Sequence, residues 1–398
     1  MTTSVTPKFE DDCRDAVLGL RGALMDLYED VGSDPTKPQD VSRKYKLNKN
    51  LTWKLARIIQ SREVYEAVPL IPGASGMEIF LDTMEKAGAS AGSLSQVREA
   101  LASYESMIEV HVGDRATLEL MLDSMGGTEQ QLLKSRKLSY QGNTGLWGVR
   151  AKSRITAQFL APNPEQPDVL DAVQIAGLQQ VRRLREIPRW SVFRIGKYED
   201  DSRRSERFAI DDQEADTPGL MRDFCRGEMP EIHIDERDDG IFYDLGEGPI
   251  GKTGEFSCYF GYGYTRFVPR YTSNAGSRGS LYCAVSMPVE QVMFDLFVHR
   301  DLPEARNAVA AIYGKPWADR GILEESAQLP IEGRVIDLGR GANVSTPMAR
   351  DYPEVIGTAF ERAGWDPKDF HCLRLVVEYP PMPSTIAMSI ELATRPGV

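Results

Sequence analysis

Three metal-ligating side chains alternate along one short stretch of the chain. Glu231, His233 and Asp235 are separated by two isoleucines. Successive side chains of a β-strand point to opposite faces, so on a strand these three polar groups would share one face. Carboxylate and imidazole groups on one face can bind a metal ion. A half-exposed strand at a sheet edge has the same alternation, and this second interpretation is favoured, with a metal site as the alternative.

A second stretch satisfies the consensus of a nucleotide-binding loop. Residues 246–253 read GEGPIGKT, which fits GxxxxGK[ST], and a strand-like run, Ile241–Leu245, precedes them. The positions that would hold a nucleotide are Gly246, Gly251, Lys252 and Thr253. A helix should follow such a loop, because the amides of a helix N-terminus hold the phosphates. The residues that follow are glycine-broken and β-like, so the sequence favours a glycine-rich hairpin linking two strands, with a nucleotide-binding enzyme as the alternative.

Basic residues are concentrated between Lys37 and Arg62. This window holds eight lysines and arginines and one acid, Asp40, so its charge is +7 in a chain of net charge −12. A local basic patch in an acidic protein indicates a docking site. At about 100° per residue, the window also predicts an amphipathic helix from Asn48 to about Ser61. Its apolar side consists of Leu47, Leu51, Leu55 and Ile58, and its outward side of Lys49, Trp53, Arg57 and Gln60.

The layout of about residues 39–60, two short helices joined by a tight turn, resembles the helix-turn-helix of bacterial transcriptional regulators. Ser42, Leu47 and Asn48 match that pattern, whereas Lys46 stands where glycine is usual and Thr52 where an aliphatic residue is usual. The resemblance covers this motif alone, and it implies binding in the major groove of double-stranded DNA. The residues that it implies at the DNA are Arg43, Lys44, Asn48, Lys49, Asn50, Trp53, Lys54 and Arg57.

The sequence therefore predicts a DNA-binding transcriptional regulator. We expect a homodimer, because operator contact usually needs two half-sites. The C-terminal domain would bind a small-molecule effector, dimerise, or do both. The alternatives are a plain amphipathic helical hairpin with a solvated cationic face, a protein–protein adaptor that meets an acidic partner, and the nucleotide-binding enzyme. The chain contains no GxSxG, HExxH or SxxK motif, so no catalytic residue and no cofactor are predicted.

Residues 1–125 are predicted to form an all-helical domain that carries the helix-turn-helix. Apolar residues recur at three- and four-residue steps in each expected helix. These helices are Lys8–Asp30, Met77–Ala87, Leu94–Ile108 and one that Asp114 caps and that runs to Met125. Ser93 and Gln96 suit a capping box. Gly126 and Gly127 mark the expected domain boundary.

Residues 127–398 are predicted to form an α+β domain with a mainly antiparallel sheet, which makes the chain multidomain. After one helix near 129–138, the expected strands are Ile155–Leu160, Trp190–Ile195, Phe256–Phe267, Ser280–Met287, Leu373–Tyr379 and Thr385–Leu392. Proline near the start and glycine just past the end indicate helices at Pro303–Tyr313 and Pro353–Ala363. Tyr379–Pro383 suits a hairpin connection. The aromatic run Tyr259, Phe260, Tyr262, Tyr264 and Phe267 is interpreted as sheet core, with the lining of an apolar ligand pocket as the alternative.

Composition sets the broad class of protein. The chain has 398 residues, of which 41% are hydrophobic and 27% charged, as in soluble globular proteins with sizeable cores. Its five cysteines are scattered and form no CxxC, which predicts reduced thiols and neither a disulfide framework nor a zinc motif. No apolar run reaches membrane length. We therefore expect a cytoplasmic protein that makes no contact with a membrane.

Overall fold

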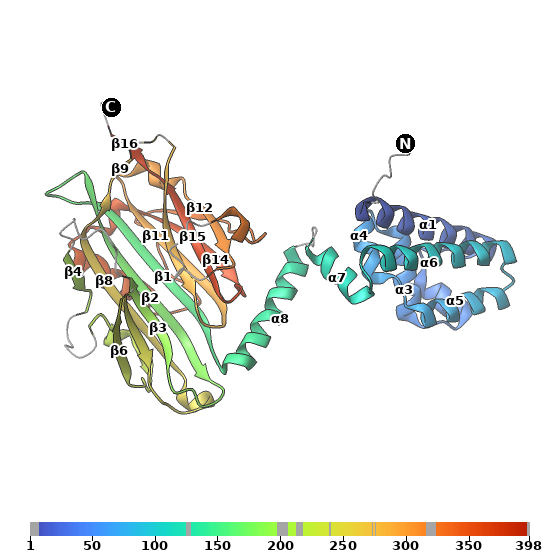
Figure 1. Ribbon diagram of the computed structural model, residues 1–398, viewed down its shortest axis with the longest axis horizontal. Helices are drawn as coiled ribbons and strands as arrows, with labels where there is room; N and C mark the ends of the chain where they lie inside the picture. The colour runs from blue at the N-terminus through green and yellow to red at the C-terminus, as the bar shows by residue number, and fades with distance from the viewer. Residues whose placement is uncertain are drawn as a thin grey trace. The chain divides into compact units, whose positions relative to one another are not determined.

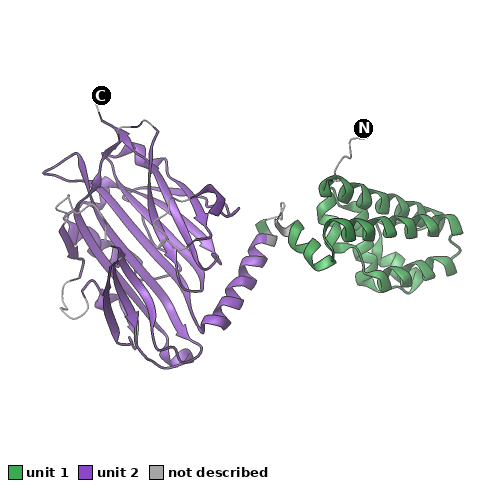
Figure 2. Ribbon diagram, in the orientation of Figure 1, with its two compact units in different colours: residues 1–131 green, residues 132–398 purple. Residues whose placement is uncertain are grey.

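The computed structural model describes residues 8–124, 129–196, 206–211, 218–238, 240–272, 274, 276–315 and 324–395. The chain divides into two compact units, residues 1–131 and residues 132–398 (Figure 2). The predicted boundary at Gly126 and Gly127 lies outside the described residues. Unit 1 is helical and unit 2 is built mainly of antiparallel strands, so the expected multidomain arrangement of a helical region followed by an α+β region is present.

Unit 1 contains most of the helices (Figure 1). They are α1 (Phe9–Asp30), α2 (Pro38–Tyr45), α3 (Lys49–Gln60), α4 (Val64–Ala67), η1 (Val68–Leu70), α5 (Ala74–Lys86), α6 (Ala91–His111) and α7 (Arg115–Ser124). The predicted amphipathic pattern explains their packing, because α1 buries Val17, Leu20 and Leu24 and α6 buries Leu94 and Val97 in one shared core.

Of the two N-terminal caps predicted for these helices, the cap of α7 is confirmed and the cap of α6 is not. Asp114 caps α7, since its carboxylate accepts a hydrogen bond from the Thr117 amide at 2.9 Å. The expected capping box of Ser93 and Gln96 is wrong, because α6 begins earlier. Its N-cap is Ser90, whose hydroxyl accepts from the Ser93 amide at 3.2 Å.

The two departures from the resemblance at α2 and α3 have simple physical explanations. Lys46 adopts a left-handed conformation, with φ of 53°, and so turns the chain where glycine is usual. Thr52 is only 1% exposed, and its hydroxyl donates to the carbonyl of Lys49 at 3.1 Å. A buried threonine can therefore replace an aliphatic residue without leaving its hydroxyl unpaired.

Replacing Lys46 with glycine is expected to raise the free energy of unfolding of unit 1 by about 0.5–1 kcal/mol, because glycine adopts a left-handed conformation without the steric cost of a Cβ. Lys46 is exposed, so little packing is lost. Urea denaturation measures the change. Lys49→Gly is the control, since Lys49 is also exposed but lies within α3, where glycine should lower stability by a similar amount. A loss of stability in both variants would contradict the prediction.

Unit 2 is dominated by strands. They are β1 (Val149–Pro162), β2 (Val169–Arg183), β3 (Trp190–Gly196), β4 (Glu206–Ala209), β5 (Arg226–Gly227), β6 (Ile232–Arg237), β7 (Gly240–Leu245), β8 (Phe256–Pro269), β9 (Tyr271–Thr272), β10 (Arg278–Val285), β11 (Val289–His299), β12 (Val309–Tyr313), β13 (Ile336–Arg340), β14 (Phe370–Glu378), β15 (Ser384–Glu391) and β16 (Ala393–Thr394). Two helices, α8 (Glu129–Trp147) and α9 (Tyr352–Ala363), accompany them, with short 3-10 turns η2 (Arg222–Phe224), η3 (Gly251–Gly254), η4 (Pro303–Arg306), η5 (Glu325–Ala327) and η6 (Pro367–Asp369).

One large sheet organises unit 2. Its eight strands include the path β13-β14-β11-β1-β2-β8-β4, with β5 also paired to β8, and only β1 and β11 run parallel to each other within it. One face packs on α9 through side chains such as Phe159 and Phe360. The other face packs on two three-stranded sheets, β3-β7-β6 and β10-β15-β12. The large sheet is thus buried on both sides.

A buried ion pair stabilises the centre of the large sheet. Asp295 on β11 is fully buried, and Arg374 on the neighbouring β14 donates to it through Nε at 2.8 Å and Nη2 at 2.7 Å. The hydroxyl of Tyr352, at the start of α9, donates to the same carboxylate at 2.8 Å. The carboxylate on β11 is therefore satisfied by donors from one neighbouring strand and from the covering helix.

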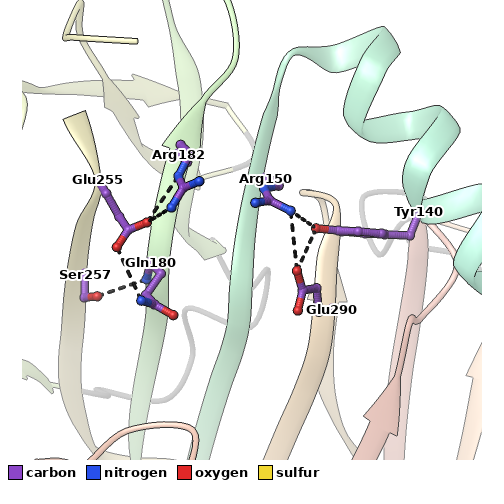
Figure 3. Close-up of polar contacts among 7 residues, drawn as sticks. All are labelled: Tyr140, Arg150, Gln180, Arg182, Glu255, Ser257 and Glu290. Carbon is purple, nitrogen blue, oxygen red and sulfur yellow. Dashed lines mark hydrogen bonds and ion pairs between the residues drawn. The ribbon is translucent and has the colours of Figure 1, made fainter. Parts of the chain in front are cut away.

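Tyr140 attaches α8 to the beginning of the large sheet (Figure 3). Arg150 on β1 donates to the Tyr140 hydroxyl at 3.2 Å and to the Glu290 carboxylate at 3.4 Å, and the hydroxyl donates to Glu290 at 3.3 Å. Burial raises the pKa of Tyr140, so its phenol keeps its proton and can act as this donor at neutral pH.

A bulge in β2 is held by a second polar cluster in the same view (Figure 3). Gln180 has φ of 52° and lies where the pairing of β2 with β8 slips. The backbone amide of Gln180 donates to the Ser257 hydroxyl at 3.0 Å. The Arg182 guanidinium pairs with Glu255, which directly precedes β8. The bulge therefore leaves no unpaired amide at Gln180.

Two sequence-based expectations for unit 2 are wrong. Pro303–Tyr313 is not a helix but the short turn η4 followed by strand β12, which pairs with β15. Tyr379–Pro383 is not a hairpin, because β14 pairs with β11 and β13 whereas β15 pairs with β10 and β12. The segment instead carries the chain from the large sheet to a small one. The helix expected at Pro353–Ala363 is confirmed as α9.

Candidate ligand-binding site

A cavity of about 790 Å³ lies within unit 2, between the large sheet and the two small sheets that cover one of its faces. Its walls come from β1, β2 and β8 of the large sheet, from β3 and β7, and from β10 and the end of β15. The large sheet is continuous, but the sheets β3-β7-β6 and β10-β15-β12 are separate. No backbone ladder therefore bridges the space between these two sheets in the described structure.

Most of the cavity wall is apolar. β2 contributes Leu170 and Ala172, and β8 with the residues next to it contributes Tyr264, Phe267 and Val268. Leu160, Val192, Phe193, Phe242, Leu281, Ile390 and Leu392 complete much of this surface. The pairing of Ala172 with both Leu160 and Tyr264 places these three strands side by side beneath the cavity.

Three polar side chains from β1 line the same cavity. Arg154, Thr156 and Gln158 alternate along the strand and so share the face that carries the cavity. Thr156 donates to the Cys283 sulfur at 3.1 Å, and the Gln158 amide donates to the Tyr282 carbonyl at 3.1 Å. In the described structure, the buried Oε1 of Gln158 and the buried Nε of Arg154 have no hydrogen-bond partner.

The charged residues of the cavity wall are all basic. Arg154 and Arg194 line it, and the described lining residues include no aspartate or glutamate. The Arg194 guanidinium lies over the Phe242 ring, 5.1 Å from its centroid, which fixes this cation against the wall. A cavity whose described wall carries arginine but no aspartate or glutamate attracts anions, in contrast to the net charge of −12 of the chain.

Two tyrosines support the wall from behind. The hydroxyls of Tyr243 and Tyr262 are 2.6 Å apart, and the ring of Phe193 stacks on that of Tyr262. Burial raises the pKa of both phenols. They therefore remain neutral at physiological pH and add no negative charge beside the arginines.

The residues predicted to face DNA lie on the surface of unit 1. All are exposed except Lys54, which is half-buried, and Trp53 is 47% exposed. Some already have structural roles. Asn48 caps α3 by accepting from the Asn50 amide at 2.8 Å, and Arg43 lies 3.6 Å from the Asp40 carboxylate. The predicted apolar side is confirmed, because Leu47, Leu55 and Ile58 are buried and Leu51 is half-buried.

The GEGPIGKT stretch connects two sheets and is neither a phosphate-binding loop nor a hairpin. β7 before it pairs with β3 and β6, whereas β8 after it pairs with β2. Gly251, Lys252 and Thr253 form the four-residue turn η3 with Gly254, and a strand follows, so no long helix presents its amides to a phosphate. Gly246 pairs its amide with the Glu231 carbonyl at 2.7 Å.

Glu231 directly precedes β6, and His233 and Asp235 lie within it. β6 is an edge strand of its sheet. His233 Nδ1 lies 3.7 Å from the Glu231 carboxylate, but Asp235 pairs with Arg237 at 2.9 Å. No group of three or more acidic, histidine or cysteine side chains among the described residues could hold a metal. The edge-strand interpretation accounts for the pattern.

The sequence identified only a small part of the cavity. Of the aromatic run, Tyr264 and Phe267 line it, Phe260 and Tyr262 belong to the core on the same face, and Tyr259 faces α9. Arg154, Thr156 and Gln158 were not singled out. The sequence signal for these three residues is the alternation of polar and apolar residues in RITAQF. This signal is weak, because one strand with such an alternation does not indicate a cavity.

All five cysteines are free. No helix in the described ranges is both long and apolar enough to cross a membrane.

Comparison with known proteins finds no family for this chain. No protein-family profile matches it, and no curated protein resembles it. Solved structures that resemble it include a two-domain M1 zinc metallopeptidase bound to L-tryptophan, at 10% identity and a TM-score of 0.26. An M1 zinc metallopeptidase from Deinococcus radiodurans has 11% identity and a TM-score of 0.26; each of these two matches covers 61% of this chain and 42% of that one.

A protease structure from Parabacteroides distasonis, described as putative, matches at 8% identity and a TM-score of 0.23, covering 63% of this chain and 41% of the other. The chain thus spans less than half the length of these proteins, and TM-scores this low transfer no activity to it. The structural likenesses are to peptidases and not to transcription regulators. On this finding, the prediction of a transcriptional regulator is wrong.

Proposed function

We propose that unit 2 binds a small, largely apolar organic molecule in the cavity between its sheets. The single observation that supports this proposal is the size of the cavity, about 790 Å³, together with its mainly apolar wall. Small-molecule sites are typically clefts or cavities of about 300–1,000 Å³, lined by apolar and aromatic residues with a few polar groups. The cavity fits each part of that description.

A structural void is a poor alternative explanation. Protein interiors pack about as densely as organic crystals, and voids larger than a water molecule are few. The apolar side chains that line this space lack packing partners on the side that faces it. A ligand that fills the cavity restores the lost van der Waals contacts.

Filling the cavity with protein is expected to weaken ligand binding at least about tenfold, because the added side chain occupies the space and removes its contacts. Ala172 suits this test, since it lines the cavity near the start of β2. The variant is Ala172→Phe. The probe is Nile red, a neutral apolar dye whose fluorescence rises on transfer out of water, titrated into the full chain.

Val309→Phe is the matched control. It adds the same ring to unit 2 at a position that is 54% exposed and does not line the cavity. We expect saturable dye binding by the unsubstituted chain and by Val309→Phe, and weakened binding by Ala172→Phe at an unchanged far-UV circular dichroism spectrum. Non-saturable binding, or equal binding by all three proteins, would exclude the proposed function.

A further inference from the structure

The guanidinium of Arg154 lacks the counter-ion that arginines inside proteins normally have. Arg154 is half-buried, its Nε is buried without a hydrogen-bond partner, and no acid in the described structure pairs with it. Buried or partly buried charges are otherwise paired, because removing an ion from water is costly. Two other arginines of the large sheet follow that rule, since Arg150 pairs with Glu290 and Arg374 with Asp295. The buried Arg183 on β2 instead donates to the Gly246 carbonyl.

We infer that the ligand of this cavity is amphipathic and carries an anionic group, of the carboxylate type, that binds to Arg154. This inference rests on the proposed function and specifies its ligand. Arginine presents a planar fork of N–H donors that matches the two oxygens of a carboxylate. Because the described wall around Arg154 includes no aspartate or glutamate, an anion is attracted to this guanidinium and a cation is repelled.

The register of the strands places the apolar part of the ligand at a distance from this charge. Arg154 pairs with Leu178, whereas Leu160 pairs with Ala172, six residues further along β1. At about 3.3 Å per residue, the two positions are about 20 Å apart. Leu170 and Val268, which pair with each other across β2 and β8, lie at the Leu160 end. A chain with an acid at one end and a hydrocarbon body fits this gradient.

Thr156 and Gln158, which lie between Arg154 and Leu160 on β1, hold the walls of the cavity together. Thr156 and Gln158 already donate to Cys283 and Tyr282, which ties β1 to the sheet on the opposite wall. Arg154 makes no such bond in the described structure and keeps its donors for a ligand. The distinction points to Arg154 as the residue that selects the ligand's charge.

A matched pair of probes tests this inference: decanoate and 1-decanol, which share a ten-carbon chain and differ in charge. Each is titrated against bound Nile red at neutral pH and at concentrations below aggregation. Decanoate should displace the dye at a lower concentration than decanol. Arg154→Met, which keeps the bulk and removes the charge, should weaken decanoate about ten- to a hundredfold, the range for a hydrogen bond to a charged group. Decanol and dye binding should change by less than about twofold.

Two further variants separate charge from structure. Arg334→Met removes an exposed arginine that does not line the cavity, so it should leave both probes unaffected. Arg154→Lys keeps the charge and should keep the preference for decanoate. If Arg154→Met fails to fold, the comparison of the two probes on the unsubstituted chain still decides the inference.

The inference fails, and the proposed function stands, if decanol competes as well as decanoate or if Arg154→Met weakens both probes equally. It also fails if only decanol displaces the dye. If Nile red does not bind saturably to the unsubstituted chain, the proposed function fails first and the inference with it. Selective loss of decanoate binding in Arg154→Met alone supports both.

Discussion

Replacing Asp295 with asparagine is expected to lower the free energy of unfolding of unit 2 by about 3–5 kcal/mol. Asp295 is fully buried and accepts two hydrogen bonds from Arg374 and one from Tyr352. The asparagine keeps the volume but removes the negative charge, so the guanidinium of Arg374 remains in the interior without its counter-ion. Such a buried unpaired charge costs far more than the ion pair itself contributes. Guanidinium denaturation followed by near-ultraviolet circular dichroism measures the loss.

An exposed ion pair provides the control for this effect. Asp337 lies 3.3 Å from Arg306, and both side chains are more than 40% exposed. Asp337→Asn removes the same charge where water can solvate the remaining arginine, so the expected loss is below about 1 kcal/mol. Equal losses in Asp295→Asn and Asp337→Asn would show that burial does not set the cost at Asp295.

Replacing Phe80 with alanine is expected to lower the free energy of unfolding of unit 1 by about 3–5 kcal/mol, the usual cost of removing a buried phenylalanine. Phe80 on α5 is fully buried, and its ring centroid lies 5.6 Å from that of Tyr28 on α1. The substitution leaves a cavity between two helices that are far apart in sequence. Loss of the helical signal at 222 nm in urea measures the change.

The neighbouring residue gives a matched control for Phe80→Ala. Ile79 lies on the opposite side of α5 and is 58% exposed. Ile79→Ala therefore removes an apolar side chain from the same helix without opening a cavity, and we expect a change within about 0.5 kcal/mol. A similar loss in both variants would contradict the prediction, because it would show that burial of Phe80 does not set the cost of removing it.

The helices of unit 1 were predictable because each has a single buried face. α1, α5, α6 and α7 all appear where apolar residues recur at three- and four-residue steps, with end differences of a few residues. The helix pair α2 and α3 was also located correctly, including its apolar side. The pattern does not assign a function to this pair, because an amphipathic helix with a cationic outer face has the same pattern whether or not it binds DNA.

The central strand β2 escaped sequence analysis for a physical reason. It is buried along almost its whole length, because α9 and the small sheets cover the two faces of the large sheet. A strand buried on both faces shows no alternation of polar and apolar residues, and VLDAVQIAGLQQVRR lacks a clear two-residue period.

The error at Pro303–Tyr313 has a different origin. Proline near its start and Gly314 after its end suit a helix, but VAAIY forms strand β12 because β15 offers it an edge. Pairing with β15 therefore overrode the local preference of this segment for a helix. The cavity was unpredictable in the same sense, since its wall is assembled from strands whose order in space differs from their order in sequence.

The parallel pairing of β1 with β11 has a consequence for biosynthesis. β1 emerges from the ribosome early, with β2 soon after it, but β11 and its partner β14 are encoded far downstream. Until they are made, one edge of β1 exposes unpaired backbone groups together with the apolar side chains that α9 later covers. While residues 163–288 are translated, the nascent chain of unit 2 must therefore keep this open sheet edge from self-association. Contacts so distant in sequence also slow folding.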